Sequence, residues 1–178
     1  MRLYLLTFAC VFIQMCYAQV HENVKPQEVF AVVDFLSSDV LMGRETATQG
    51  ELIAAQYIQS KLIEAGIKPY FKTYLDSFDS KSKMGVNVVG FIEGNDPVLK
   101  NEIVILGAHY DHVGFGHKVA NDSIANGAND NASGTAAVLT IANRIAKSKA
   151  NKRSVIVALF FGEEKGLIGS KALAKKLK

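Results

Sequence analysis

Apolar residues recur at helical spacing in two segments near the start of the chain. In residues 27–37 the apolar positions that share one face are Val29, Phe30, Val33 and Leu36. The second segment opens with Thr48 and Glu51, the polar pair of a capping box, and keeps apolar residues on one face as far as Gly66. This spacing predicts two amphipathic helices, with Gly66 ending the second.

Shorter apolar runs predict strands. Residues 69–75 and 87–92 have strand character and are separated by a polar stretch of Ser, Asp and Lys, and residues 94–97 are expected to form a turn. Residues 103–108 and 155–161 are continuous apolar runs of strand length, which are typical of strands buried on both faces. We therefore expect each of these two strands to lie inside a sheet.

A loop and a helix connect those two buried strands. The loop is rich in Gly and Asn and covers the 19 residues 113–131, a length that is usually functional in a compact domain. The helix after it carries Val138, Ile141, Ala142 and Ile145, and another begins near Gly166. The order strand, helix, strand predicts a parallel pair with a right-handed crossover. The expected fold class is α/β, with a mostly parallel central sheet and helices on both faces.

The first 18 residues have the pattern of a secretory signal peptide. Arg2 precedes an apolar stretch over residues 3–16, and Cys16 and Ala18 are the small residues before Gln19. The alternatives are a membrane anchor, for which the stretch is short, and a lipoprotein signal that ends at Cys16. We expect cleavage after Ala18, a secreted or periplasmic protein, and no stable membrane span in the mature chain.

Composition limits the remaining possibilities. With 178 residues, 49% of them hydrophobic, the chain can form one domain over residues 19–178, and its small net charge of +3 does not favour nucleic-acid binding. Cleavage of the signal would remove both cysteines, Cys10 and Cys16. A metal in the mature protein would therefore be held by His, Asp and Glu.

Such side chains follow the predicted strands. His109 comes directly after one strand, Glu163 and Glu164 follow the other after one glycine, and Asp130 precedes the connecting helix. Ligands of α/β sheets bind at the carboxyl ends of the strands, so one site should contain all of them. His109 can bind zinc with Asp111 orienting its ring, and one glutamate can bind metal while the other acts as a general base.

Each segment also has a simpler explanation. A His-x-Asp sequence is often a surface hydrogen-bonded pair, Glu-Glu is often a solvated helix start, and Asn-Asp-Asn is often only a turn. Their expected meeting at one sheet edge favours chemistry. His112 and His117 are interpreted as loop histidines that could support ligands, and His21 is assigned no role.

Together these residues resemble metallopeptidase family twenty-eight, the di-zinc aminopeptidases of the bacterial leucyl aminopeptidase type. The resemblance extends over most of the mature chain. Its segments are LMGR at 41–44, NVVG at 87–90 with Glu93-Gly94, GAHYDH at 107–112, GANDNASG at 127–134 and GEEKGLIGS at 162–170.

The resemblance implies a peptidase site with two Zn²⁺ per complete domain. In it His109 binds the first zinc, with Asp111 in support; Asp130 bridges both ions and has a cis peptide bond to the next residue; Glu164 binds the second zinc; and Glu163 is the general base. A water bridging the two metals would hydrolyse the N-terminal bond of a peptide with an unblocked N-terminus.

The resemblance also implies two ligands that this chain does not supply. Family members add a later carboxylate for the first zinc and a late histidine for the second, both expected beyond residue 178. We therefore expect the chain to be the amino-terminal, C-terminally incomplete part of a peptidase domain, inactive alone. Two other functions remain open, a non-catalytic binding relative and an acyltransferase like the single-zinc glutaminyl cyclases.

Overall fold

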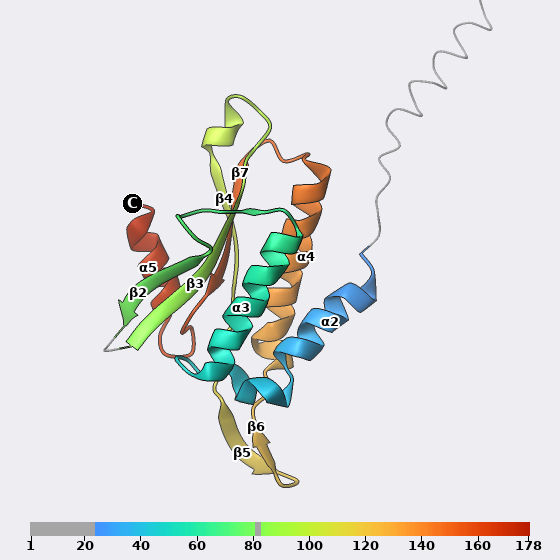
Figure 1. Ribbon diagram of the computed structural model, residues 1–178, viewed down its shortest axis with the longest axis vertical. Helices are drawn as coiled ribbons and strands as arrows, with labels where there is room; N and C mark the ends of the chain where they lie inside the picture. The colour runs from blue at the N-terminus through green and yellow to red at the C-terminus, as the bar shows by residue number, and fades with distance from the viewer. Residues whose placement is uncertain (1–23, 81–82) are drawn as a thin grey trace, which may run out of the picture.

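The computed structural model describes residues 24–80 and 83–178, so the expected signal peptide lies outside the described residues. The helices are α2 (Pro26–Leu36), α3 (Gln49–Glu64), α4 (Ser133–Ser148) and α5 (Ile168–Lys176) (Figure 1). The strands are β1 (Lys68–Pro69), β2 (Leu75–Ser80), β3 (Lys83–Ile92), β4 (Ile103–His109), β5 (Phe115–Val119), β6 (Asp122–Ile124) and β7 (Ser154–Phe160). Among the described helices, none is both long enough and apolar enough to span a membrane.

The central sheet has five strands and mixed polarity. Its order is β1-β3-β7-β4, and β2 also pairs with β3. The expected parallel pair is confirmed, because β4 and β7 run side by side from Ile103↔Ser154 to His109↔Phe160. The expectation of a mostly parallel sheet is wrong for the described residues, since β1, β2 and β7 are all antiparallel to β3. A parallel pair needs a long crossover, and only the β4–β7 connection contains one.

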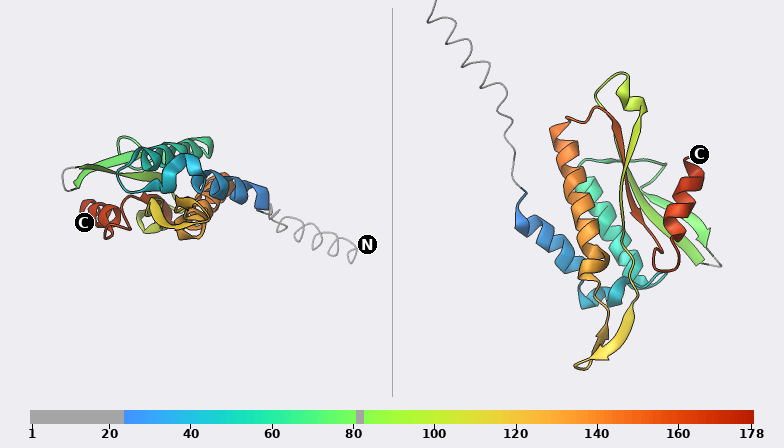
Figure 2. Two further views of the ribbon diagram at one scale, coloured as in Figure 1. Left: turned by 90° about the horizontal axis from the view of Figure 1, so that it is seen from below. Right: turned by 180° about the vertical axis from the view of Figure 1, so that it is seen from behind.

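Alternate residues of β7 face two apolar layers. Val155, Val157 and Leu159 belong to the main core, together with buried residues of α2, α3 and α4. Ile156 and Ala158 point the other way, where they pack with Leu173 of α5. Helices therefore cover both faces of the sheet, as the fold class requires, and Figure 2 shows α5 on the opposite side from α3.

Strand β4 was expected to be buried on both faces, and it is not. Ile103, Val104 and Ile105 are 46%, 45% and 52% exposed, whereas the residues of β7 are almost all buried. In the described part of the chain β4 is the last strand of the sheet, so nothing covers its outer edge or the start of its faces. An apolar run measures hydrophobicity and cannot tell a central strand from an edge strand.

Two segments expected to lack regular structure form hairpins. The polar stretch before residue 87 belongs to β2 and the start of β3, which pair from Leu75↔Val88 onward, whereas of residues 69–75 only the first and the last are in strands. The expected loop 113–131 contains the β5–β6 hairpin, whose turn residues Ala120 and Asn121 have φ of 47° and 72°. Positive φ at both turn residues matches the twist of a two-residue hairpin. Cross-strand pairing thus forms the β5–β6 hairpin without an apolar run in the sequence, and it joins the polar β2 to the apolar β3.

The expected capping box starts α3. Thr48 Oγ1 accepts a hydrogen bond from the Glu51 amide at 3.5 Å, while Glu51 Oε2 accepts one from the Ala47 amide at 2.6 Å. Glu51 is only 3% exposed, and Oε1 has no partner among the described residues. Burial raises the pKa of Glu51 to about 8. The Ala47 amide before the helix is therefore bound by a carboxyl group whose raised pKa favours its protonated form.

Candidate metal centre

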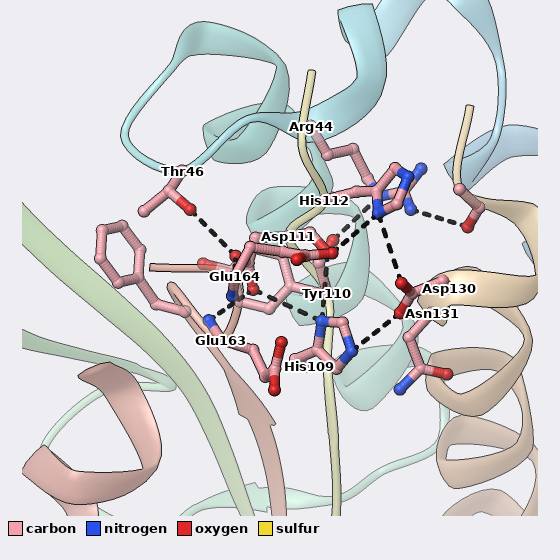
Figure 3. Close-up of polar contacts among 12 residues, drawn as sticks. Arg44, Thr46, His109, Tyr110, Asp111, His112, Asp130, Asn131, Glu163 and Glu164 are labelled. Carbon is pink, nitrogen blue, oxygen red and sulfur yellow. Dashed lines mark hydrogen bonds and ion pairs between the residues drawn. The ribbon is translucent and has the colours of Figure 1, made fainter. Parts of the chain in front are cut away.

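The β4–β7 register brings the predicted site residues together. His109 pairs with Phe160, so the carboxyl ends of the two strands lie next to each other, and Glu163 and Glu164 follow β7 at the same edge. Asp130 lies in the irregular turn Ala128–Ala132 that leads into α4. Figure 3 shows these side chains converging on one region. The prediction that these side chains meet at one edge of the sheet is thus confirmed.

His109 faces Asp130 on one side and Asp111 on the other. Its Nε2 lies 3.2 Å from Asp130 Oδ1, and its Nδ1 lies 3.2 Å from the Asp111 carbonyl oxygen and 3.6 Å from Asp111 Oδ1. The hydrogen bond with Asp111 holds the pKa of His109 above its ordinary value. The Asp111 contacts fix the ring so that Nε2 points at the Asp130 carboxylate.

Asp111 also connects the two strand ends. Its buried carboxylate accepts hydrogen bonds from the amides of Glu163 and Glu164 at 3.0 and 3.3 Å, and from the Thr46 hydroxyl at 2.9 Å. Burial alone would raise the pKa of Asp111, but the interaction with the His109 ring and the hydrogen bonds from these three donors outweigh it and hold the pKa low. Asp111 therefore positions both glutamates as well as the histidine, which the sequence did not predict.

The turn that carries Asp130 has an unusual backbone. The peptide bond between Asp130 and Asn131 is cis, as expected from the resemblance, and Gly127 has φ of 60°. Asn131 Oδ1 accepts the Gly134 amide at 2.9 Å and so caps the first turn of α4. The Asp130 side chain is 55% exposed, and its two oxygens face different imidazoles, His109 and His112.

The two glutamates point differently, as adjacent residues should. Glu164 Oε1 lies 3.0 Å from His112 Nδ1, so this carboxylate faces the His112 ring. The Glu163 carboxylate lies beside His109 (Figure 3) and has no hydrogen bond or ion pair within residues 24–80 and 83–178. Glu164 is therefore placed among potential metal ligands, and Glu163 has oxygens available for a proton.

Sequence reasoning missed the position of His112. Its Nδ1 lies within reach of Glu164 and 3.9 Å from Asp130 Oδ2, and the three residues form a group whose potential ligand atoms all lie within 4.8 Å of one another. The only signal in the sequence is that His112 lies three residues after His109, in the same strand-end loop. That spacing does not say which way a loop side chain points.

Sequence reasoning also missed Arg44, which is fully buried beneath the site. Its guanidinium donates hydrogen bonds to the carbonyl oxygens of Tyr110 at 2.9 Å, Asn126 at 2.8 Å and Gly127 at 3.0 Å, and also to that of Leu36. Burial lowers its pKa to about 10. The LMGR segment was noted only as part of the resemblance, but its arginine joins the His109 loop to the Asp130 loop.

The donor set fits zinc. Ligand atoms about 2 Å from a tetrahedral zinc are about 3.3 Å apart, which is close to the 3.2 Å between His109 Nε2 and Asp130 Oδ1. In the described residues, the ion-pair partners of Asp130 and Glu164 are imidazoles, with no Lys or Arg among them. Two carboxylates that converge with imidazole nitrogens suit a divalent cation. Fold and site together define an α/β protein with a candidate imidazole–carboxylate metal centre.

The family comparison agrees with this class. The model for peptidase family M28 matches residues 87–178, which is just over half of the chain. The chain therefore belongs to peptidase family M28, as the resemblance indicated. The matched range contains the five predicted site residues, while the Arg44 segment precedes it.

Two relatives in sequence are an enzyme that inactivates leupeptin and a probable aminopeptidase. Leupeptin-inactivating enzyme 1 of Streptomyces exfoliatus is 33% identical over 129 residues, which cover 72% of this chain and 26% of that protein. A probable leucine aminopeptidase of Arthroderma otae is 30% identical over 139 residues, covering 75% of this chain and 35% of that protein. The chain thus spans about a quarter to a third of the length of these relatives.

Solved structures share the fold. LapB from Legionella pneumophila has a TM-score of 0.65 at 24% identity, covering 90% of this chain and 43% of that one. A glutaminyl cyclase from Tannerella forsythia has a TM-score of 0.54 at 19% identity, covering 76% of this chain and 46% of that one. At these identities the likeness concerns the fold alone.

Proposed function

We propose that the complete protein containing this chain is a zinc-dependent aminopeptidase with two Zn²⁺ per domain. The observation that carries the proposal is the convergence of His109, Asp130 and Glu164 at one sheet edge, with the Glu163 carboxylate beside them. Its substrate would be a peptide with an unblocked N-terminus, as the aminopeptidase name of the Arthroderma otae relative suggests.

Each residue has a distinct task in this proposal. His109 and Asp130 would hold one Zn²⁺, and Asp130 and Glu164 would hold the other, so Asp130 would serve both. Zinc would polarise the scissile carbonyl and make water at the site more acidic. Glu163 takes a proton from the attacking water and returns it to the departing amine. Asp111 keeps His109 and both glutamates in register through its hydrogen bonds.

The proposal is tested by Glu163→Gln in the full-length protein. We expect zinc content to be unchanged and turnover of an aminoacyl-anilide to fall by roughly 10²–10⁴, because the amide cannot accept the proton. The matched control is Glu102→Gln, which alters an exposed glutamate paired with Arg153 away from the site. Near-normal turnover by a zinc-loaded Glu163→Gln protein would contradict the assigned role.

A glutaminyl cyclase activity is the second candidate, because a protein of that activity shares the fold. It predicts one zinc per chain and ring closure of an N-terminal glutamine with release of ammonia, instead of release of the N-terminal residue. The Asp130 carboxylate favours the two-metal peptidase, because its two oxygens face two different imidazoles. Zinc analysis with a glutaminyl peptide and a leucyl peptide as parallel substrates separates the two. A protein of full fold with neither zinc nor turnover would instead be a binding relative.

We also propose that the protein is secreted or periplasmic, on the strength of the signal-like residues 1–18. Expression with and without these residues, followed by fractionation, tests this: only the longer form should be exported, with a mature N-terminus at Gln19. Retention of the longer form in the cytoplasm would contradict the proposal.

A further inference from the structure

His112 lies in the candidate metal centre, but the proposed peptidase mechanism gives it no role. Its ring is 13% exposed and its Nδ1 is 3.0 Å from Glu164 Oε1 and 3.9 Å from Asp130 Oδ2. These two separations lie on either side of the roughly 3.3 Å expected between ligand atoms on one tetrahedral zinc. The same imidazole nitrogen therefore faces both carboxylates that would hold the second metal (Figure 3).

The position of the His112 backbone is fixed by the protein. Its amide donates a hydrogen bond to the Arg44 carbonyl oxygen at 3.0 Å, and the residue forms a β-bridge with Glu45. Arg44 in turn binds the Gly127 carbonyl oxygen of the Asp130 loop. The backbone of His112 is thus tied to the loop that carries one of its two carboxylate neighbours.

The fold also leaves space for the His112 ring beside Gly127. A Cβ atom added to Gly127 would lie 2.5 Å from His112 Cδ2 and 2.6 Å from His112 Cγ, closer than side chains pack. Glycine at this left-handed position (φ 60°) therefore leaves the space that the imidazole fills. Preorganisation of this kind is what a metal ligand requires, because ordering a side chain on binding weakens affinity.

The charges of Asp130 and Glu164 also favour a bound cation at this position. Glu164 has His112 as its ion-pair partner among the described residues, and Asp130 has His112 and His109. No Lys or Arg of the described residues pairs with either carboxylate. A divalent cation between the three side chains would satisfy both carboxylates and the Nδ1 lone pair together.

We propose that His112 is a direct ligand, through Nδ1, of the metal ion held by Asp130 and Glu164. The described residues would then give that position three protein ligands, and the position of His109 and Asp130 two. This inference rests on the proposed function. The rival role is a hydrogen bond from Nδ1–H that only orients Glu164, and the experiment below is designed to separate the two.

The test uses the full-length protein, stripped with a chelator and refilled with Co²⁺ as the probe. Three variants are compared with the wild type. His112→Ala removes both roles; His112→Asn retains a nitrogen near the place of Nδ1 that can donate to Glu164 but is a poor metal ligand; and His117→Asn makes the same change at an exposed histidine of the β5–β6 hairpin. Thermal melting of the metal-stripped forms checks that each variant folds.

If His112 is a ligand, Ala and Asn should weaken one of the two Co²⁺ sites to a similar extent, by more than about tenfold. Both should also remove one imidazole from the cobalt coordination shell, as counted by X-ray absorption and the visible spectrum. His117→Asn should behave as the wild type. If His112→Asn binds both ions with an unchanged imidazole count, His112 only orients Glu164 and the inference is overturned, while the proposed function stands. A wild-type protein that takes up no Co²⁺ would overturn both.

Discussion

The most informative perturbation of the centre is Asp111→Asn, because it keeps the shape of the side chain and removes its charge. The Asp111 carboxylate accepts three hydrogen bonds, from the amides of Glu163 and Glu164 and from Thr46 Oγ1. An asparagine offers one oxygen and one NH₂ group in the same place. At least one of the two backbone amides must therefore face another donor.

The size of the effect follows from these contacts. The least costly amide orientation keeps the 3.0 Å bond from Glu163, lets the Thr46 hydroxyl rotate to accept, and leaves the Glu164 amide without a partner. A buried N–H without an acceptor costs about 1–3 kcal/mol, and each retained bond loses about 1 kcal/mol on becoming neutral. Burying an amide is easier than burying a carboxylate, which offsets part of this. We expect a loss of about 2–3 kcal/mol in the free energy of unfolding.

Urea unfolding in chelator measures this loss separately from metal binding. The control is Asp122→Asn at the exposed start of β6, which keeps an oxygen for the Ile124 amide and should change stability by less than about 0.5 kcal/mol. With zinc present, Asp111→Asn should also weaken metal binding by about 10–100-fold, since His109 and Glu164 lose their support. A stability loss no greater than that of the control would refute the claim that Asp111 holds the two strand ends together.

Three further predictions concern other parts of the molecule. Burial raises the pKa of Glu51 from an ordinary 4.5 to about 8, so between these pH values the folded chain keeps a proton that the unfolded chain has lost. The free energy of unfolding should therefore fall as pH rises from 4.5 to 8. Glu51→Gln should flatten that dependence in urea titrations across this range. Arg44→Lys should cost at least about 2 kcal/mol in the same assay, because one ammonium group cannot reach all four carbonyl oxygens; a neutral result would show that the guanidinium is dispensable. Asp130→Ala should lower zinc occupancy at both positions, whereas Glu164→Ala should empty mainly one; a full zinc complement in Asp130→Ala would contradict its double role.

Local pattern was sufficient for the parts of the fold that are decided locally. Helical spacing and a capping box defined α3 within one or two residues, because helix contacts are three or four residues apart. The strand–helix–strand order implied the parallel β4–β7 pair, and that pair implied that His109, Asp130 and Glu164 would meet. The family motifs lie at these same strand ends, so the sequence alone determined the fold class and the location of the site.

Contacts between distant residues decided the rest. Whether β4 is central or at an edge depends on which strands lie beside it, and its apolar run is the same in either case. The polarity of β3 relative to its neighbours depends on connections and pairing partners. Polar hairpins such as β5–β6 gain their stability from cross-strand hydrogen bonds, which leave little trace in hydrophobic spacing.

Contacts between distant residues also explain why the sequence predicted His109, Asp130 and Glu164 but not the position of His112. His109, Asp130 and Glu164 could be located because each lies within a few residues of a strand or helix end, where direction is set by the regular element. His112 is also near a strand end, three residues after β4, but its orientation is set by the Arg44 carbonyl and by the space beside Gly127, which come from two other segments of the chain. The sequence thus determined where the candidate metal centre lies, and only the tertiary structure brought His112 to it, because contacts between distant residues orient that side chain.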